Sequence, residues 1–164
     1  MKYYDEIAKG YDELYGEEQA KKWAVAKKMV SFSKNDVVLD LGCGTGLTIP
    51  EIAKQVKMVV GMDYSAGMLE KAPKSSNVIY VLGDAAEIPF EDKYFDKVVS
   101  LTMIQDIKKW QPVLAEIKRV CKGEVVLTLL KRGKDIEEVK KKIGKFFKVK
   151  NFIEEEKDYI FLLR

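Results

Sequence analysis

The chain has 164 residues, of which 47% are hydrophobic, and this suits one folded domain with its own core rather than two. It contains no histidine, which excludes histidine general bases, Ser-His-Asp chemistry and histidine-containing zinc sites. The net charge is only +3, although charged residues make up 34% of the chain. Lysine and glutamate dominate these charges, a composition that favours a thermophilic source.

Apolar runs in this chain are all shorter than the roughly 20 residues that cross a membrane. The segment Met1–Glu6 also lacks the apolar core of a signal peptide. The two cysteines, Cys43 and Cys121, lie far apart in the sequence and do not make a metal site. We therefore expect a cytoplasmic protein with buried thiols, no metal and no membrane partner. The oligomeric state stays open.

The hydrophobic pattern predicts an N-terminal helical lid over residues 1–31 and a core over residues 36–164 of a single domain. Residues 3–15 are expected to be short helical or irregular structure, and residues 17–31 a helix. Strands are expected at 37–41, 58–63, 78–82, 97–101, 124–130, 147–153 and 159–163, with helices between them at 48–55, 66–71, 112–120 and 134–145. Strands that alternate with helices imply a parallel sheet.

The last two expected strands break this alternation, because only a short segment near 155–158 separates them. They should therefore form a hairpin. The segment Tyr159–Leu163 is apolar throughout, so we expect both of its faces to be buried.

The most informative segment is the run from Val37 to Gly46. An apolar strand ends in Gly42, Gly44 and Gly46, and a helix follows, with Thr48 expected as its N-cap. A strand, a glycine turn and a helix bring backbone against a nucleotide-like ligand. A dinucleotide site needs glycine at position 47, where leucine stands, and a phosphate loop needs a lysine after its glycine. The turn therefore fits a ligand without a pyrophosphate.

This run resembles the first motif of the class I S-adenosylmethionine-dependent methyltransferases. Residues 63–72 resemble the family's Asp-x-Ser-x-x-Met-Leu-x-x-Ala signature, residues 83–90 its Gly-Asp-Ala-x-x-Leu-Pro-Phe signature, and residues 94–100 the start of its fourth strand. The resemblance, which covers about residues 37–130, is to the type 11 and quinone-biosynthesis enzymes. It implies an α/β fold with a Rossmann-like, seven-stranded, mostly parallel sheet, an antiparallel final strand and helices on both faces.

The resemblance also implies S-adenosylmethionine as cofactor and S-adenosylhomocysteine as product. It places these residues at the cofactor: Tyr11, Asp40, Gly42, Cys43, Gly44, Gly46, Asp63, Tyr64, Met68, Asp84, Ala85, Thr102 and Met103. Asp63 would accept both ribose hydroxyls. Asp84 would accept from the adenine amino group beside the Ala85 backbone. Tyr64 and Met68 would cover the adenine and ribose, although ordinary core packing explains these two as well.

The remaining cofactor contacts surround the methionine end. The resemblance implies that Asp40 supports the glycine turn and faces the methionine ammonium. Thr102 and Met103 would lie beside the sulfonium. Residues 7–12 resemble the entry segment of small-molecule methyltransferases, in which a tyrosine covers the cofactor; here it would be Tyr11, with Tyr15 and Tyr4 as candidate lid partners. An amphipathic helix that packs its aromatic residues explains Tyr11 equally well.

Residues 104–107 depart from the Leu-His-His-Leu of related small-molecule enzymes. Asp106 is the candidate general base and Gln105 the candidate acceptor-orienting group, although methyl transfer needs neither when the reactants are aligned. Asp106 could instead cap a helix that begins near Lys108. Tyr11, Tyr15, Gln105, Asp106 and Trp110 are expected around the acceptor.

Two features bear on the class of acceptor. The Asp/Asn-Pro-Pro-Tyr segment of nucleobase and glutamine methylation is absent, and the basic stretch 131–150 has the pattern of a helix with one buried face, marked by Ile136, Val139 and Ile143. We therefore expect a methyltransferase with a small-molecule acceptor. The alternatives are a tRNA or protein acceptor, or a non-catalytic module that binds S-adenosylmethionine.

Overall fold

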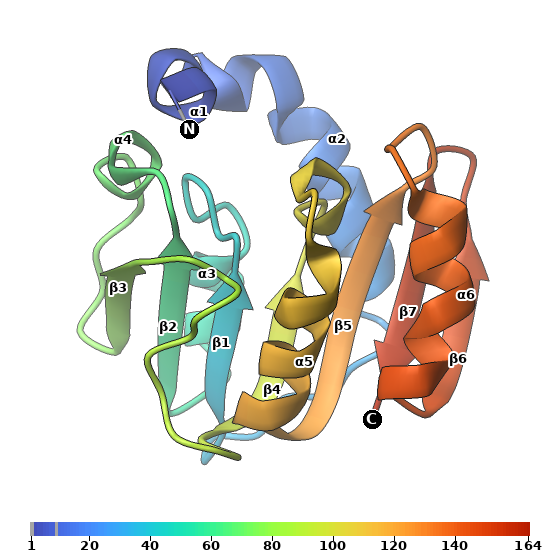
Figure 1. Cartoon of the computed structure of the whole chain (residues 1–164). Coiled ribbons are helices and arrows are strands. Elements are labelled where there is room, and N and C mark those ends of the chain that lie inside the picture. The colour runs from blue at the N-terminus through green and yellow to red at the C-terminus, as the bar shows by residue number, and fades with distance from the viewer. Residues whose placement is uncertain (1, 9) are drawn as a thin grey trace.

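The computed structural model describes residues 2–8 and 10–164. Within them a seven-stranded sheet lies between two layers of helices (Figure 1). The elements in chain order are α1 (Lys2–Ile7), α2 (Tyr11–Ala26), β1 (Val37–Leu41), α3 (Ile49–Ala53), β2 (Met58–Asp63), α4 (Ala66–Leu69), β3 (Val78–Leu82), β4 (Phe95–Ser100), the 3-10 helix η1 (Ile104–Asp106), α5 (Trp110–Val120), β5 (Cys121–Leu130), α6 (Ile136–Phe146), β6 (Val149–Glu154) and β7 (Asp158–Leu163).

The strand order is β3-β2-β1-β4-β5-β7-β6, and β7 runs antiparallel to both of its neighbours. This confirms the expected sheet, including the inserted antiparallel strand. The order reverses between β1 and β4, which pair in parallel with Leu39 opposite Val98. The connection after β1 leads to one side of the sheet and the connection after β4 to the other side. A crevice is therefore expected outside the carboxyl ends of β1 and β4.

Alternate residues of each central strand enter two different cores. Leu39 and Val98 belong to the cluster beneath α5 and α6, whereas Val38 and Val99 belong to the cluster beneath α2 and α3. Parallel strands covered on both faces read as continuous apolar runs for this reason. All six residues of β7 are buried, which confirms the burial predicted for Tyr159–Leu163.

The predicted buried face of α6 is confirmed, since Ile136, Val139 and Ile143 are at most 2% exposed. Several boundaries differ from the prediction, most of all those of α2 and β5. Helix α2 begins at Tyr11 instead of residue 17 and ends at Ala26, so that Val30 can enter the core at 7% exposure. Strand β5 follows α5 without a loop and begins at Cys121 instead of residue 124.

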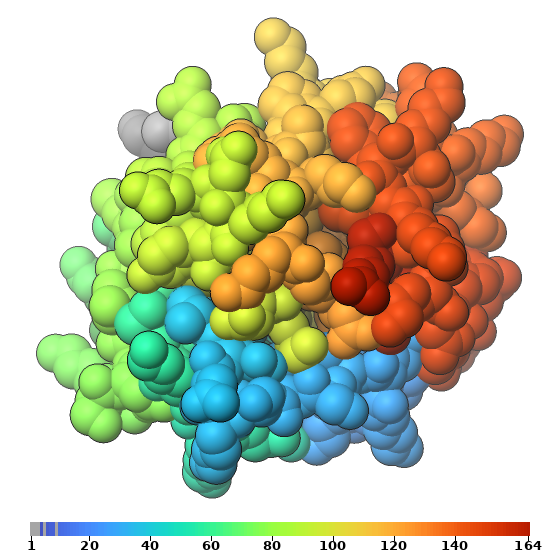
Figure 2. Space-filling model, turned by 90° about the horizontal axis from the view of Figure 1, so that it is seen from below, coloured from blue at the N-terminus to red at the C-terminus, as the bar shows by residue number. Residues whose placement is uncertain are grey.

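The two edges of the sheet differ in what covers them. Helices α1 and α4 and the first turns of α2 lie beyond the carboxyl ends of the parallel strands (Figure 1). Figure 2 views the opposite edge, where the segment that enters β1, the turn before β4 and the start of β5 meet. There the Val37 amide donates a 2.9 Å hydrogen bond to Asp96. Among the described residues, no helix is long and apolar enough to cross a membrane.

Candidate functional site

The glycine turn after β1 has the left-handed backbone that its glycines permit. Gly42, Gly44 and Gly46 have φ angles of 74°, 54° and 75°. The amides of Gly42 and Cys43 donate to the Met62 carbonyl at 2.8 and 3.1 Å, which fixes the turn to β2. The Cys43 thiol is buried, and burial raises its pKa above the usual range, so it is no nucleophile at neutral pH.

The turn is crowded at one glycine and open at the next. A Cβ at Gly42 would lie 2.8 Å from Cγ of Met103, so Met103 packs directly against the turn. A Cβ at Gly44 would meet no atom within 4 Å. The backbone at Gly44 therefore borders open space at the carboxyl edge of the sheet, where a ligand can approach it.

Asp63 ends β2 beside this open space. One carboxylate oxygen, Oδ2, accepts the Gly44 amide at 2.8 Å, and the other, Oδ1, accepts the Ser65 amide at 2.9 Å. Asp63 therefore orders both the glycine turn and the start of α4. Each carboxylate oxygen can accept more than one donor, so these bonds are compatible with two ligand hydroxyls.

Asp40, at the end of β1, is 2% exposed and accepts a hydrogen bond from the Thr48 hydroxyl. Thr48 is the N-cap residue of α3, as expected, but its side chain makes no cap bond. Burial raises the pKa of Asp40 to about 7, and the charge of Asp63 adds to the rise while the Thr48 bond opposes it. This carboxyl is therefore poised between its two forms near neutral pH.

The adenine-side residues lie after β2 and β3. Asp84 is exposed, and its Oδ1 accepts the Ala86 amide at 2.8 Å, which shapes the turn that contains Ala85. Tyr64 is 42% exposed, whereas Met68 is only 1% exposed. The burial of Met68 suits the packing alternative. The cofactor contacts of these four residues stay predictions.

Tyrosines from the N-terminal helices gather over the carboxyl edge. The ring of Tyr4 lies 6.3 Å from that of Tyr11 and 6.0 Å from that of Tyr64, and Tyr11 lies 5.1 Å from Tyr15. Burial, with a contribution from the Asp63 charge, raises the pKa of Tyr11 to about 12. Tyr11 therefore stays neutral and can donate a hydrogen bond near Asp63. Its role as a cofactor cover stays a prediction.

Two hydrogen bonds fasten these helices to the site. The Tyr4 hydroxyl donates to Oδ2 of Asp106 at 2.7 Å, and the Thr45 hydroxyl of the glycine turn donates to Oδ1 of Asp12 at 2.6 Å. The sequence indicated Tyr4 as a candidate lid partner of Tyr11 but did not predict its bond to Asp106. No role was predicted for Asp12, which lies in the segment 7–12 that resembles a methyltransferase entry segment.

The segment after β4 brings Gln105 and Asp106 together. Gln105 Nε2 donates to the Thr102 carbonyl and, at 3.2 Å, to Oδ2 of Asp106, and both its protons are thereby used. Its buried Oε1 has no hydrogen-bond partner among the described residues. The amide oxygen is thus left to accept a donor.

Two expectations about this segment are wrong. Helix α5 begins at Trp110 with Lys109 at its N-cap position, so Asp106 does not cap it. The Trp110 side chain is 3% exposed and belongs to the core beneath α5 and α6, so it does not wall the site. The apolar face of α5 takes Trp110 inward because Val113, Leu114 and Ile117 follow it at helical spacing.

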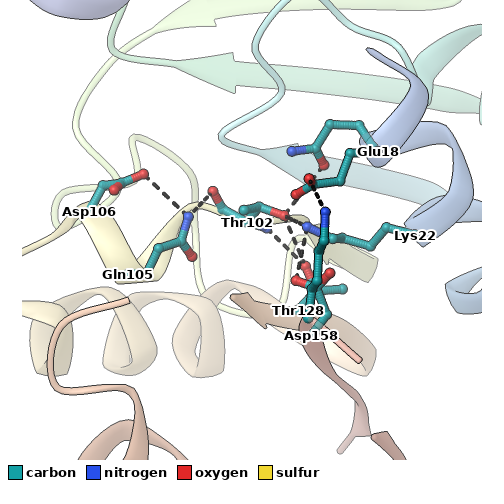
Figure 3. Close-up of polar contacts among 9 residues, drawn as sticks. Glu18, Lys22, Thr102, Gln105, Asp106, Thr128 and Asp158 are labelled. Atoms are coloured by element: carbon teal, nitrogen blue, oxygen red, sulfur yellow. Dashed lines mark hydrogen bonds and ion pairs between the residues drawn. The ribbon is translucent and has the colours of Figure 1, made fainter. Parts of the chain in front are cut away.

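A buried polar cluster that sequence reasoning missed lies beside Thr102 (Figure 3). Lys22, from α2, donates to the Thr102 hydroxyl, and its Nζ lies 2.9 Å from Oδ1 of Asp158 at the start of β7. The Thr102 amide donates to the Thr128 hydroxyl at 2.9 Å, and Thr102 itself has a left-handed φ of 54°. A faint signal existed in the sequence, because Lys22 shares a helix face with the apolar Ala26.

The family profile described as "Methyltransferase domain" matches residues 39–129 of the chain. An uncharacterized protein of Methanocaldococcus jannaschii is 33% identical over 96% of this chain and 62% of its own length. The demethylmenaquinone methyltransferase of Corynebacterium glutamicum strain R is 32% identical over 77% of this chain and 56% of its own length. The chain thus spans about three fifths of the length of these relatives.

Solved structures share the fold at lower identity. A Haloferax volcanii methyltransferase, solved in complex with the Trm112 methyltransferase activator, superposes with a TM-score of 0.86 at 16% identity, covering 98% of this chain and 96% of that one. At this identity the likeness concerns the fold alone.

Proposed function

Because the chain belongs to the class I S-adenosylmethionine-dependent methyltransferases, we propose that it binds S-adenosylmethionine at the carboxyl edge of its sheet and transfers the methyl group to a small molecule. One observation carries the cofactor assignment. The backbone at Gly44 borders open space while its amide is held by Asp63, the acid that ends β2. A glycine turn and a strand-end acid in this arrangement suit a ribose and its attached chain.

The residues that would hold the cofactor surround that space. Asp63 would accept the ribose hydroxyls, Asp40 would face the methionine ammonium, and Tyr11 would cover the ligand from α2. Asp84 and Ala85 would contact the adenine, with Tyr64 beside them, and Thr102 and Met103 would lie near the sulfonium. When bound, S-adenosylmethionine supplies a methyl group already activated by its positive sulfur, so the protein mainly aligns the acceptor.

The acceptor would enter between the N-terminal helices and η1. Asp106 would take a proton from the acceptor, and the unpartnered Oε1 of Gln105 would accept from an acceptor N–H or O–H group. The tyrosine rings of α1 and α2 restrict this region, which supports a small acceptor. The demethylmenaquinone methyltransferases among the relatives, named for a small-molecule substrate, favour the same class.

A tRNA or protein acceptor is the second candidate. The structural neighbour from Haloferax volcanii was solved with an activator protein, so a partner that completes the site is an outcome to test. A non-catalytic module would bind the cofactor and transfer nothing.

Calorimetry and thermal denaturation with S-adenosylmethionine, S-adenosylhomocysteine and NAD test the cofactor assignment. A ligand at about 100 times its dissociation constant adds about 2.7 kcal/mol to the free energy of unfolding. For a chain of this size the melting temperature should rise by roughly 5 to 10 °C. Binding of NAD alone would contradict the proposal. Tritiated-methyl transfer into separated small-molecule, RNA and protein fractions of a cell extract then identifies the acceptor class.

A further inference from the structure

The ion pair between Lys22 and Asp158 lies where an ion pair is costly. Its two side chains are 1% and 8% exposed, in contrast to the pair of Lys27, at the C-cap of α2, with Glu51 of α3, whose side chains are 39% and 42% exposed. Burying two charges costs several kcal/mol, and apolar residues of similar size are often at least as stable. A contribution to the stability of the fold is therefore a weak explanation for the charges of Lys22 and Asp158.

The pair touches the candidate site through one residue. Lys22 bonds to the side chain of Thr102, and the next residue, Met103, packs against Gly42 of the glycine turn. Two neighbouring lysines have carboxylate partners of their own, since Lys21 lies 2.6 Å from Glu17 and Lys157 lies 3.3 Å from Glu18. Asp158 is thus the carboxylate that balances Lys22 at this end of the sheet (Figure 3).

We propose, on the basis of the cofactor assignment above, that Asp158 neutralises Lys22 so that the site beside Thr102 accepts the positive sulfonium of S-adenosylmethionine. An unbalanced ammonium at Lys22 would repel that charge, because charges interact strongly where water is excluded. The product, S-adenosylhomocysteine, carries a neutral thioether at the same position and is indifferent to this charge. The pair therefore sets the relative affinity for cofactor and product, and Lys22 and Asp158 act as specificity-determining residues.

The test measures both dissociation constants by calorimetry for the whole chain and for three variants. In Asp158→Asn, affinity for S-adenosylmethionine should fall about three- to tenfold relative to affinity for S-adenosylhomocysteine. Lys22→Met leaves a carboxylate and should shift the ratio in the opposite direction. The double variant, which is neutral again, should restore the ratio of the unaltered protein.

A matched control is Glu51→Gln, which removes the α3 carboxylate that pairs with Lys27 at the end of α2 and should leave the ratio unchanged. A purely structural role would weaken both ligands equally in every variant, and that result would overturn the inference. If Asp158→Asn fails to fold, Lys22→Met and the double variant still decide the sign. If the unaltered protein binds neither ligand, the cofactor assignment itself fails, which is a separate outcome.

Discussion

The hydroxyl of Tyr4 donates a 2.7 Å hydrogen bond to Oδ2 of Asp106 and so joins α1 to η1 across 102 residues of sequence. Burial, together with this bond, raises the pKa of Tyr4 above its usual range, so the phenol stays protonated at any pH of interest. The bond holds α1 over the carboxyl edge, and it occupies the oxygen of Asp106 that also accepts from Gln105. Asp106, which is expected to act on the acceptor, therefore also holds α1 in place over this edge.

Tyr4→Phe removes this bond and keeps the ring. We expect faster amide hydrogen exchange in residues 2–8 and a cofactor affinity that falls about threefold or more, because the cover opens more often. The free energy of unfolding should fall by only about 1 kcal/mol, since a single partly exposed hydrogen bond is lost. Tyr94→Phe, at an exposed tyrosine before β4, is the control. Unchanged exchange in residues 2–8 would show that the bond does not hold the cover.

Asp106→Asn separates the chemical role of Asp106 from its structural role. An asparagine oxygen can still accept from Tyr4, but it cannot take a proton from the acceptor. Cofactor affinity should therefore stay within about twofold, while transfer to a true acceptor falls by at least about tenfold. Steady-state kinetics and calorimetry on the same preparation measure both. A normal rate of methyl transfer in Asp106→Asn would mean that Asp106 has a structural role only.

Local sequence signals predicted the strands and the glycine turn well, because each depends on neighbouring residues. The run Val37–Leu41 is apolar apart from Asp40 because both faces of β1 are covered. Residue 42 is glycine because a Cβ there would clash with Met103. The polar contacts that close the site were not predictable in the same way. Lys22 and Asp158 lie 136 positions apart in the sequence and meet only because β7 inserts antiparallel beside β5.

The same limit applies to the roles assigned to single residues. Thr48 has the sequence of an N-cap, but the buried Asp40 takes its hydroxyl instead. Trp110 follows the site segment in sequence, but the helical spacing of α5 turns it into the core. For Thr48 a tertiary partner outweighs the local preference, and a sequence without its fold does not reveal that partner. The spacing that buries Trp110 with Val113 and Ile117 is, in contrast, present in the sequence.

Alanine at Gly42 and at Gly44 should have different consequences. Both positions have a left-handed φ, so each alanine costs about 1–2 kcal/mol of backbone strain. At Gly42 the added Cβ also clashes with Met103, and the unfolding free energy should fall by about 1 kcal/mol or more beyond that strain. At Gly44 no protein atom is in the way, so the loss should appear mainly as cofactor affinity. Denaturant unfolding and calorimetry compare the two, and equal affinity losses would contradict this assignment of space.

Asp63→Ala should weaken cofactor binding by about 2–4 kcal/mol, because two charge-assisted hydrogen bonds to the ribose are lost. The structure adds a second effect. The amides of Gly44 and Ser65 lose their acceptor, so the free energy of unfolding should fall by about 1–2 kcal/mol as well. Asp36→Ala, which removes an aspartate that accepts the Ser33 amide at the opposite edge, is the control for lost turn bonds. If Asp63→Ala binds the cofactor as tightly as the unaltered protein does, the ribose does not lie at Asp63.

The raised pKa of Asp40 predicts how stability depends on pH. The carboxyl titrates at about 7 in the folded chain and near 3.9 in an unfolded one. Between these values the folded chain holds a proton that the unfolded chain releases. The contribution of this proton to the free energy of unfolding is therefore complete at low pH and is lost as pH rises through about 7. The loss is up to about 4 kcal/mol of unfolding free energy. The Asp40→Asn variant should not show this loss. The loss is measured as the difference between the unfolding free energies of the variant and of the unaltered protein as a function of pH.

The same group should make cofactor binding depend on pH in the opposite direction. A methionine ammonium beside Asp40 favours the ionised carboxylate, so binding must release the proton that burial retains. Affinity for S-adenosylhomocysteine should therefore rise about tenfold from about pH 5.5 to about pH 7, with proton release. Calorimetry in two buffers of different ionisation enthalpy counts the protons. Asp40→Asn keeps an acceptor for Thr48 and should bind with little pH dependence. Affinity that falls with rising pH over this interval would mean that the ammonium lies away from Asp40.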